Sequence, residues 1–280
     1  MQFRTLRSPL SAVALLIGLS IPLGSTGCGA IGQLNLIPID QDPALGAEAY
    51  LQLLQNEQLI QSGPEYTAIV EMTDRLVEAA REVNPDIVNR FEWEVKLVKR
   101  DDLVNAWALP GGKMAVYTGI LPVAAAGTAD LQTGLAVVMG HEIAHATLRH
   151  GTKAMTRQMG ANAMVALGSF LIGSQVGESQ GQMAALAGSF AANFGTLHYG
   201  RSAELEADRR GLLYMAKAGY DPREAVAFWK RMQAASGGQA PPEWLSTHPT
   251  NDRRIAQIEE LLPEVLPAYE QSRGTSRRNP

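Results

Sequence analysis

Cysteine is nearly absent from this 280-residue chain, which has only Cys28. No disulfide can form within the chain, so its stability must come from packing and from any bound metal. Aromatic residues are few, at 6%, whereas Ala, Gly and Leu are plentiful, a composition that favours closely packed helices over an all-β sandwich. The net charge is −4, so no excess of basic residues argues for binding to nucleic acid.

Long apolar runs are also missing, since no stretch is long enough to span a bilayer comfortably. The run Leu10 to Leu23 has the length of a signal-peptide core, follows two arginines and precedes small residues that end in Cys28. Residues 1–28 are therefore predicted to be a lipoprotein-type signal peptide, with Cys28 as the lipidated mature N-terminus. Ser25 stands where a lipobox usually has Leu, Val or Ile, so an ordinary cleaved signal and an uncleaved anchor stay open.

The rest of the chain divides into three predicted parts. Residues 29–46 are expected to be a tether, residues 47–265 a folded domain and the polar residues 266–280 a disordered tail. The expected fold class is α+β, mainly helical, with a small sheet flanking a cleft. Apolar periodicity predicts helices over 47–60, 65–83, 131–149, 203–219, 222–235 and 251–262, and strands over 91–97, 104–109 and 114–118.

The segment Gly160 to Phe194 is rich in Ala, Gly and Met and has almost no charge beyond Glu178. Its most apolar part, Ala161 to Ile172, is too short and too interrupted by glycine for a membrane span. Three interpretations stay open: a core helix pair, a helix covering the cleft, and a surface that contacts lipid or an unfolded client.

The most specific pattern in the chain is His141-Glu142-Ile143-Ala144-His145, an HExxH motif. Histidines four residues apart lie on one face of a helix, so both imidazoles can reach one metal ion. The glutamate between them points to the same side, where it can take a proton from a metal-bound water.

A second group of candidate ligands lies in the segment Arg201 to Asp208. Glu204 and Asp208 are four residues apart and share a helical face, whereas Glu206 lies about 200° round the helix. We expect one of the two carboxylates to bind metal and the other to orient a ligand histidine. Two histidines and one glutamate form a catalytic zinc set that leaves a fourth position for water. A solvated acidic helix face is the alternative.

With these motifs in place, the chain resembles the HtpX and CaaX-prenyl-protease-like family of zinc metallopeptidases. It looks most like the periplasmic branch that carries out quality control of outer-membrane protein assembly, the β-barrel assembly-enhancing type. The resemblance covers about Ala47 to Leu262. It rests on four features in order: Asn105 to Gly112, His141 to His145, Arg201 to Asp208, and His248-Pro249 followed by Arg254-Ile255.

The resemblance implies a gluzincin-type site with one Zn²⁺ per chain. In that pattern His141, His145 and Glu204 bind the zinc, Glu142 is the general base and Asp208 supports a ligand from behind. The segment Asn105, Ala106, Trp107 and Ala108 would form an edge strand to which an extended substrate adds through main-chain hydrogen bonds.

Two further residues have roles implied by the family pattern. His248 is expected to approach the zinc, either to stabilise the oxyanion or to cap the metal in a resting state; a loop-closing histidine is the alternative. Arg254 is expected to pair with a carboxylate of the cleft or to stabilise developing negative charge. His150 lies about 180° from His141 if the helix continues, so we expect it not to join the metal. His198 is taken as structural.

The predicted function is that of a zinc-dependent metalloendopeptidase of the cell envelope, which cleaves exposed or misfolded proteins. The protein is expected to be exported to the periplasm and anchored to the outer membrane through Cys28. Polypeptide substrates and the outer-membrane assembly machinery are the expected partners. The alternative is a chaperone-like binding protein that uses zinc as a structural clip.

Overall fold

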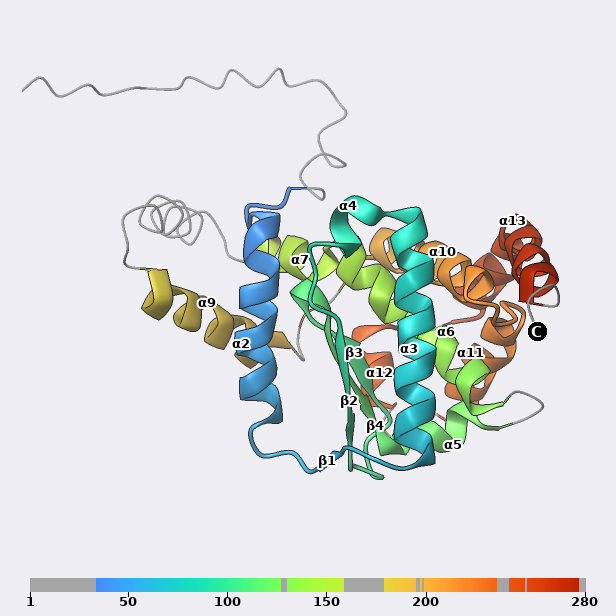
Figure 1. Ribbon diagram of the computed structural model, residues 1–280, viewed down its shortest axis with the longest axis horizontal. Coiled ribbons are helices and arrows are strands. Elements are labelled where there is room, and N and C mark those ends of the chain that lie inside the picture. Colours follow the sequence, from blue (N-terminus) through green and yellow to red (C-terminus); the bar gives the residue numbers. More distant parts are fainter. Residues whose placement is uncertain are drawn as a thin grey trace, which may run out of the picture. The chain divides into compact units, whose positions relative to one another are not determined.

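The computed structural model describes residues 34–126, 130–158, 179–194, 197, 199–235, 242–249 and 251–276. Helices dominate, and one four-stranded sheet has the order β1-β2-β4-β3 (Figure 1). The predicted α+β class is therefore confirmed. The helices are α2 (Asp42–Leu54), α3 (Pro64–Val83), α4 (Pro85–Val88), α5 (Leu121–Ala124), α6 (Leu131–Thr147), α7 (His150–Gln158), α9 (Ser179–Phe194), α10 (Arg201–Lys217), α11 (Glu224–Ala235), α12 (Glu243–Thr247) and α13 (Asp252–Ser276). The strands are β1 (Leu59–Ile60), β2 (Glu94–Val98), β3 (Ala106–Ala108) and β4 (Lys113–Tyr117).

Both faces of the sheet are covered by apolar side chains. Because side chains alternate along a strand, neighbouring residues enter two different clusters. In β4, Met114 and Val116 belong to the apolar cluster that includes residues of α3 and α6. Ala115 and Tyr117 point the other way, into the cluster that includes α2 and α9. Figure 1 accordingly shows α2 and α3 on opposite sides of the sheet.

Strand β3 lies at the edge of the sheet, as predicted. It pairs antiparallel with β4, in the register Ala106 with Val116 and Ala108 with Met114. At its two ends Asn105 and Leu109 exchange hydrogen bonds with β4. Because backbone groups alternate in direction along an antiparallel strand, those of Ala106 and Ala108 face the outer edge, where no other described strand pairs.

The N-terminal helix begins earlier than predicted. The sequence indicates a tether over 29–46, but α2 starts at Asp42. Tertiary contacts explain the difference: the Asp42 carboxylate is buried against Arg149, and Gly46 lies under the Pro110 carbonyl, where a Cβ would be 1.8 Å from the oxygen. Residues 1–33, which carry the predicted signal and Cys28, lie outside the described part of the chain.

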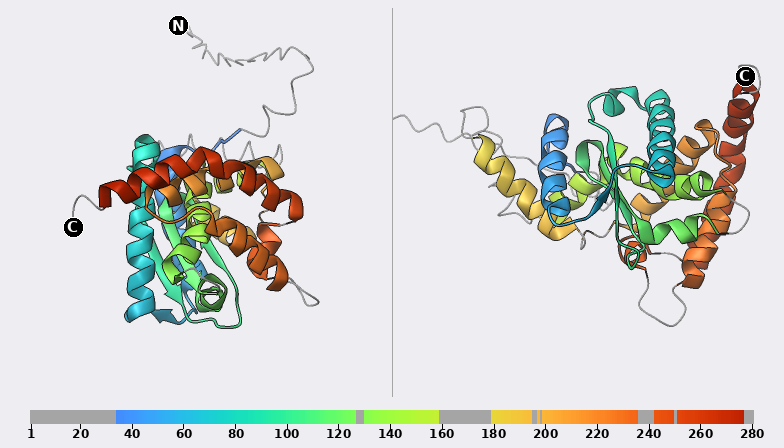
Figure 2. Two further views of the ribbon diagram at one scale, coloured as in Figure 1. Left: turned by 90° about the vertical axis from the view of Figure 1, so that its right-hand side faces the viewer. Right: turned by 60° about the horizontal axis from the view of Figure 1, so that its bottom comes forward.

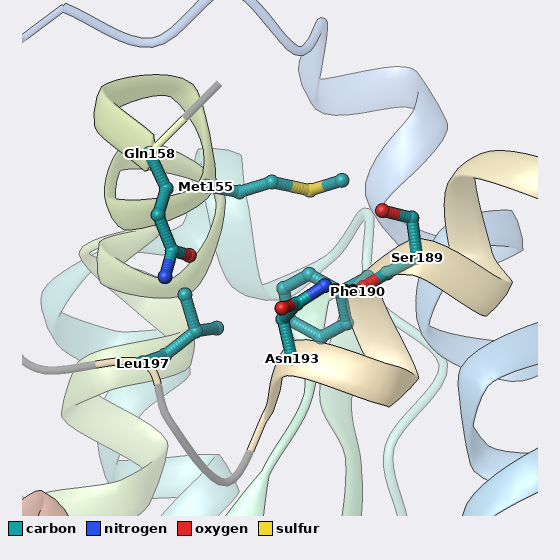
Figure 3. Close-up of a pocket in the computed structure, with 6 residues that line it drawn as sticks. All are labelled: Met155, Gln158, Ser189, Phe190, Asn193 and Leu197. Carbon is teal, nitrogen blue, oxygen red and sulfur yellow. Dashed lines mark hydrogen bonds between the residues drawn. The ribbon is translucent and has the colours of Figure 1, made fainter. Parts of the chain in front are cut away.

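Helix α9 covers the far half of the apolar segment 160–194. It packs along α2, and the views of Figure 1 and Figure 2 agree on this arrangement. Phe190 is buried, and the Phe194 ring meets Trp107 edge-on with centroids 5.8 Å apart. A cavity of about 260 Å³ lies between α7 and α9, and Figure 3 shows Phe190 and Asn193 on its α9 side. The described part of this segment therefore packs one face against the core; residues 160–178 lie outside the described residues.

The C-terminal helix extends beyond its predicted end. The sequence predicts a helix that ends at Leu262 and a disordered tail over 266–280, yet α13 continues to Ser276 through both Pro263 and Pro267. The lost N–H groups are offset by packing against α10: Val265 is buried, and the Ser272 hydroxyl donates to the Ala216 carbonyl at 3.0 Å. Among the described residues, no helix has the length and apolar character needed to cross a membrane.

Helices α6 and α10 make the most extensive contact between helices, and glycines set their separation. A Cβ on Gly140 would lie 2.9 Å from the Gly211 carbonyl oxygen, and a Cβ on Gly211 would lie 2.8 Å from the backbone at Gly140 and His141. The two backbones can approach this closely only because neither residue has a side chain. This approach brings the HExxH helix against the helix that carries Glu204 and Asp208.

We predict that Gly211→Ala forces these helices apart and lowers the free energy of unfolding by about 1–3 kcal/mol, the usual cost of overpacking. Urea unfolding of the metal-free protein measures this. Gly274→Ala is the matched control, since Gly274 is exposed in α13 and a Cβ there meets nothing within 4 Å. Equal stability of Gly211→Ala and wild type would contradict the assignment of this contact.

Candidate metal centre

Three separate parts of the chain deliver the candidate ligands to one buried point. Helix α6 supplies His141 and His145, α10 supplies Glu204, and the residue after α12 supplies His248. Helix α6 is fixed at its start by Asp130, whose carboxylate accepts a hydrogen bond from the Thr133 N–H at 2.8 Å. All four candidate side chains are buried, and each offers one ligand atom within 4.8 Å of the others.

The spacing of these atoms fits a tetrahedral metal site. The Nε2 atoms of His141 and His145 lie 3.0 Å apart. Glu204 Oε2 lies 3.5 Å from Nε2 of His141, and Glu204 Oε1 lies 3.3 Å from Nε2 of His145. His248 Nδ1 is 3.2 Å from His141 Nε2 and from both Glu204 oxygens. Zinc bonds of about 2.0–2.1 Å in a tetrahedron separate ligand atoms by about 3.4 Å, so this donor set suits zinc.

Glu142 lies beside this group rather than in it. Its Oε1 accepts a hydrogen bond of 2.7 Å from the indole N–H of Trp244 and lies 3.4 Å from His248 Nε2. Trp244 is fully buried and stacks on Trp229, with ring centroids 5.0 Å apart. Trp244 of α12 therefore engages the Glu142 carboxylate, and His248 takes the fourth position of the candidate ligand group.

Arg254 neutralises the carboxylates behind the ligands. Its guanidinium pairs bidentately with Asp208 at 2.8 and 2.9 Å, and its Nη1 lies 2.9 Å from Glu204 Oε2. Asp208 Oδ1 in turn lies 2.9 Å from Nδ1 of His141, although not in line with its ring N–H. The arginine also stacks over the Trp229 ring at 4.0 Å. Asp208 thus lies behind a ligand histidine, the position that the resemblance implies.

Burial and charge pull the pKa values of this cluster in opposite directions. Burial disfavours a charged His141, but Asp208 and Glu204 outweigh it and raise the His141 pKa to about 9. Burial likewise disfavours ionised Asp208, but Arg254 and His141 bring its pKa down to about 2. Burial and the neighbouring charge of His141 lower the pKa of His145, which stays neutral. Neutral imidazole and ionised carboxylate are the forms that bind metal.

The sequence did not predict the role of His150. Helix α6 ends at Thr147, Arg149 adopts a left-handed backbone with φ 58°, and α7 begins at His150. The premise of a continuous helix is therefore wrong, and the buried His150 turns back so that its Nδ1 lies 3.0 Å from Nδ1 of His145. It lies behind the ligand ring, outside the metal group. His198 lies outside the described residues.

Helix α12 also meets the predicted substrate strand. The Trp244 N–H donates to the Val104 carbonyl at 3.4 Å, and the Asn105 amide donates to Glu243 at 3.4 Å. Trp107 is buried, and its indole N–H donates to the Tyr117 hydroxyl at 3.2 Å. Of the four residues predicted to bind substrate, only Ala106 and Ala108 thus turn backbone groups to the outer edge.

A surface cavity of about 370 Å³ reaches the centre from the side of α10. Glu204 and Asp208 lie at its inner wall, and the exposed Arg201 and Arg253 lie on its walls. The candidate ligand Glu204 therefore lines a surface cavity to which no residue of α12 contributes.

An HExxH helix, a carboxylate converging from a second helix and a small flanking sheet define a metallopeptidase domain. Residues 68–262 match Peptidase family M48, and the chain belongs to that family. The family resemblance expected from the motifs is thereby confirmed.

Several relatives are similar over most of this chain. It is 32% identical to the mitochondrial metalloendopeptidase OMA1 of Schizosaccharomyces pombe over 83% of its length and 64% of that protein. It is 31% identical to the mitochondrial metalloendopeptidase OMA1 of Homo sapiens over 83% of its length and 44% of that protein. The β-barrel assembly-enhancing protease of Escherichia coli is 28% identical over 96% of this chain and 55% of its own length. The chain thus spans less than two thirds of each of these relatives.

We predict that Arg254→Ala lowers the free energy of unfolding of the metal-free protein by about 3–5 kcal/mol, because two buried carboxylates lose their cation. Arg254→Lys recovers only part of this loss, since lysine cannot pair bidentately with Asp208. The neighbouring exposed Arg253→Ala is the control and changes stability by at most about 0.5 kcal/mol. Denaturant unfolding of the three variants compares these values; an unchanged Arg254→Ala would refute the charge-balancing role.

Proposed function

We propose that this protein is a zinc-dependent endopeptidase that cleaves exposed or misfolded proteins. The observation that carries the proposal is the tetrahedral set of buried donor atoms from His141, His145, Glu204 and His248, with the Glu142 carboxylate directly beside it. Membership of Peptidase family M48 supports the same reaction.

The residues of the centre divide the work of peptide hydrolysis. Zinc, when bound, lowers the pKa of water and polarises the scissile carbonyl. His141, His145 and Glu204 hold it, while Asp208 and Arg254 orient His141 and balance charge. Glu142 takes the proton from the attacking water and delivers it to the leaving amine. The outward carbonyl of Ala106 and the outward amide and carbonyl of Ala108 hold an extended substrate as an added strand, while the Ala106 N–H donates to the Asn105 side chain.

The conformation described above is a resting one. His248 fills the fourth ligand position and the Trp244 indole donates to Glu142, so both the open metal position and the base are already engaged by the protein's own side chains. Of the two roles expected for His248, the cap on the metal is the one this geometry supports. A productive complex requires α12 to withdraw from Val104 and from Glu142.

We further propose that the protein works in the cell envelope, exported by residues 1–28 and anchored through lipidated Cys28. The signal-like sequence and the β-barrel assembly-enhancing relative of Escherichia coli support this location and a link to outer-membrane assembly. The mitochondrial relatives support the endopeptidase reaction but not this compartment. Mass spectrometry of the mature N-terminus tests the anchor, and an unmodified or uncleaved terminus would sink it.

One observation favours a second function, a chaperone-like binding protein with a structural zinc. Structural zinc sites usually have four protein ligands, and His248 completes such a set here. A purely structural site, however, gives no reason to bury Glu142 beside the ligands. Casein degradation with and without a chelator separates the two, since a binding protein would bind casein and cleave none.

We predict that Glu142→Gln keeps one zinc per chain but lowers the rate of casein cleavage by about 10²- to 10⁴-fold, the usual contribution of a general base. Glu204→Ala should instead lose the zinc. Glu259→Gln, exposed on α13, is the control with full activity and full zinc content. Metal analysis and cleavage assays on the same preparations give both quantities, and an active Glu142→Gln protein would exclude the assigned base.

For His248 we predict that substitution by alanine speeds cleavage of a short unstructured peptide. Opening the site removes the population of capped molecules, so the rate rises by the inverse of the open fraction in wild type. Ser246 is exposed on α12, and Ser246→Ala is the control that leaves the rate unchanged. A fall of about 10²- to 10³-fold would instead mark His248 as an oxyanion donor and would contradict the capping role.

A further inference from the structure

The two histidines of the HExxH motif are supported from behind by different chemistry. His141 Nδ1 faces the carboxylate of Asp208, which is itself held by Arg254. His145 Nδ1 faces no carboxylate; its partner, at 3.0 Å, is Nδ1 of His150. Both His145 and His150 are buried, with exposed fractions of 2% and 4%. Water therefore does not compete for this contact.

The left-handed turn at Arg149 makes the contact possible, and distant parts of the chain hold that turn in place. The Arg149 guanidinium donates to both oxygens of Asp42 at 2.7 and 2.8 Å and to the Ile37 carbonyl at 2.6 Å. A left-handed conformation is uncommon for a residue other than glycine and persists where its surroundings enforce it. Residues near the N-terminus of the described chain thus determine where the His150 ring lies.

The protons of the two rings follow from the contact. A neutral imidazole has one N–H donor and one lone-pair acceptor. A metal ion bound at Nε2 of His145 would leave the ring proton on Nδ1, which would then donate to Nδ1 of His150. His150 then carries its own proton on Nε2, which lies 3.5 Å from the Glu206 carboxylate. In this arrangement the Nδ1 side of His145 has a neutral partner, whereas the only carboxylate that contacts its ring among the described residues, Glu204, lies at Nε2.

We propose that His150 is the positioning residue of His145 and sets how tightly the site retains its metal ion. The proposal rests on the metal site of the proposed function. His150 is not a ligand itself, because it approaches the ring from the side opposite Nε2 and lies outside the group of converging donor atoms. It fixes the tautomer and the orientation of His145, whereas Asp208 does the same for His141 through a charged contact.

Two amide substitutions test the contact atom by atom. The Asn side chain can place its carbonyl oxygen where Nδ1 of histidine lies, whereas Gln places its amide near the position of Nε2. His150→Asn therefore keeps an acceptor for His145, His150→Gln does not, and His150→Leu removes all polar contact. All variants are made in the full chain and loaded with Zn²⁺ or with Co²⁺ as a spectroscopic substitute.

The measured quantities are the rate of Zn²⁺ transfer to a chromogenic chelator and the visible absorption of the Co²⁺ form. We expect His150→Gln and His150→Leu to release Zn²⁺ at least about tenfold faster than wild type and to alter the Co²⁺ bands. His150→Asn should stay within about threefold of wild type, since it keeps a hydrogen-bond acceptor opposite Nδ1 of His145. Urea unfolding of the metal-free proteins separates a positioning role, which leaves the Asn and Gln variants equally stable, from loss of packing.

Equal release rates for the Asn and Gln variants would overturn the proposal, as would a folded Leu variant that holds zinc like wild type. If His150→Leu fails to fold, the comparison of Asn with Gln still decides. Failure of the proposed function is distinguishable, because no readout here is cleavage. A chain that binds zinc and cleaves no polypeptide would refute the peptidase and leave the role of His150 standing.

Discussion

Burial of opposite charges around the histidines is the constraint on which the rest of this structure depends. Glu204 and Asp208 both lie within the protein, where an ionised carboxylate without a partner would cost several kcal/mol. The single guanidinium of Arg254 contacts both of them. Arg254 belongs to α13, so its ion pairs tie this last helix to the centre. Helix α13 also packs against α10 (Figure 2).

Close helix packing supplies the second requirement, the distance between ligands. The metal group needs donor atoms from α6 and α10 within about 3.5 Å, and this is possible because Gly140 and Gly211 meet where the helices cross. The same helix α6 is limited at both ends, by the Asp130 cap before it and by the turn at Arg149 after it. The Asp130 cap and the Arg149 turn therefore fix where α6 begins and ends, and the glycine contact fixes its distance from α10.

Most helical elements and the convergence of the candidate ligands were predictable because their signals are local. HExxH and the spacing from Glu204 to Asp208 place side chains on a shared helical face whatever the rest of the chain does. His150 was missed because its position depends on the backbone of Arg149, which is enforced by Asp42, 107 residues away. Trp244 and Glu142 are 102 residues apart in sequence, and no periodic pattern predicts their contact.

The errors at the ends of the domain have a similar origin. Prolines at 263 and 267 are good local reasons to end a helix, yet α13 continues because α10 offers it a surface and the Ala216 carbonyl accepts from Ser272. The start of α2 at Asp42 likewise depends on Arg149 and on the Pro110 turn. Local rules describe the chain well until a distant partner outweighs them.

The outer edge of β3 has one more implication. In the proposed function this edge recognises backbone through the Ala106 carbonyl and the amide and carbonyl of Ala108, since the Ala106 N–H already donates to the Asn105 side chain. The backbone of a folded protein is already engaged in its own secondary structure. Selection at such an edge screens for conformation before it screens for side chains. Folded proteins would not bind to this edge, whereas an unfolded segment would present free backbone N–H and C=O groups that can pair with β3.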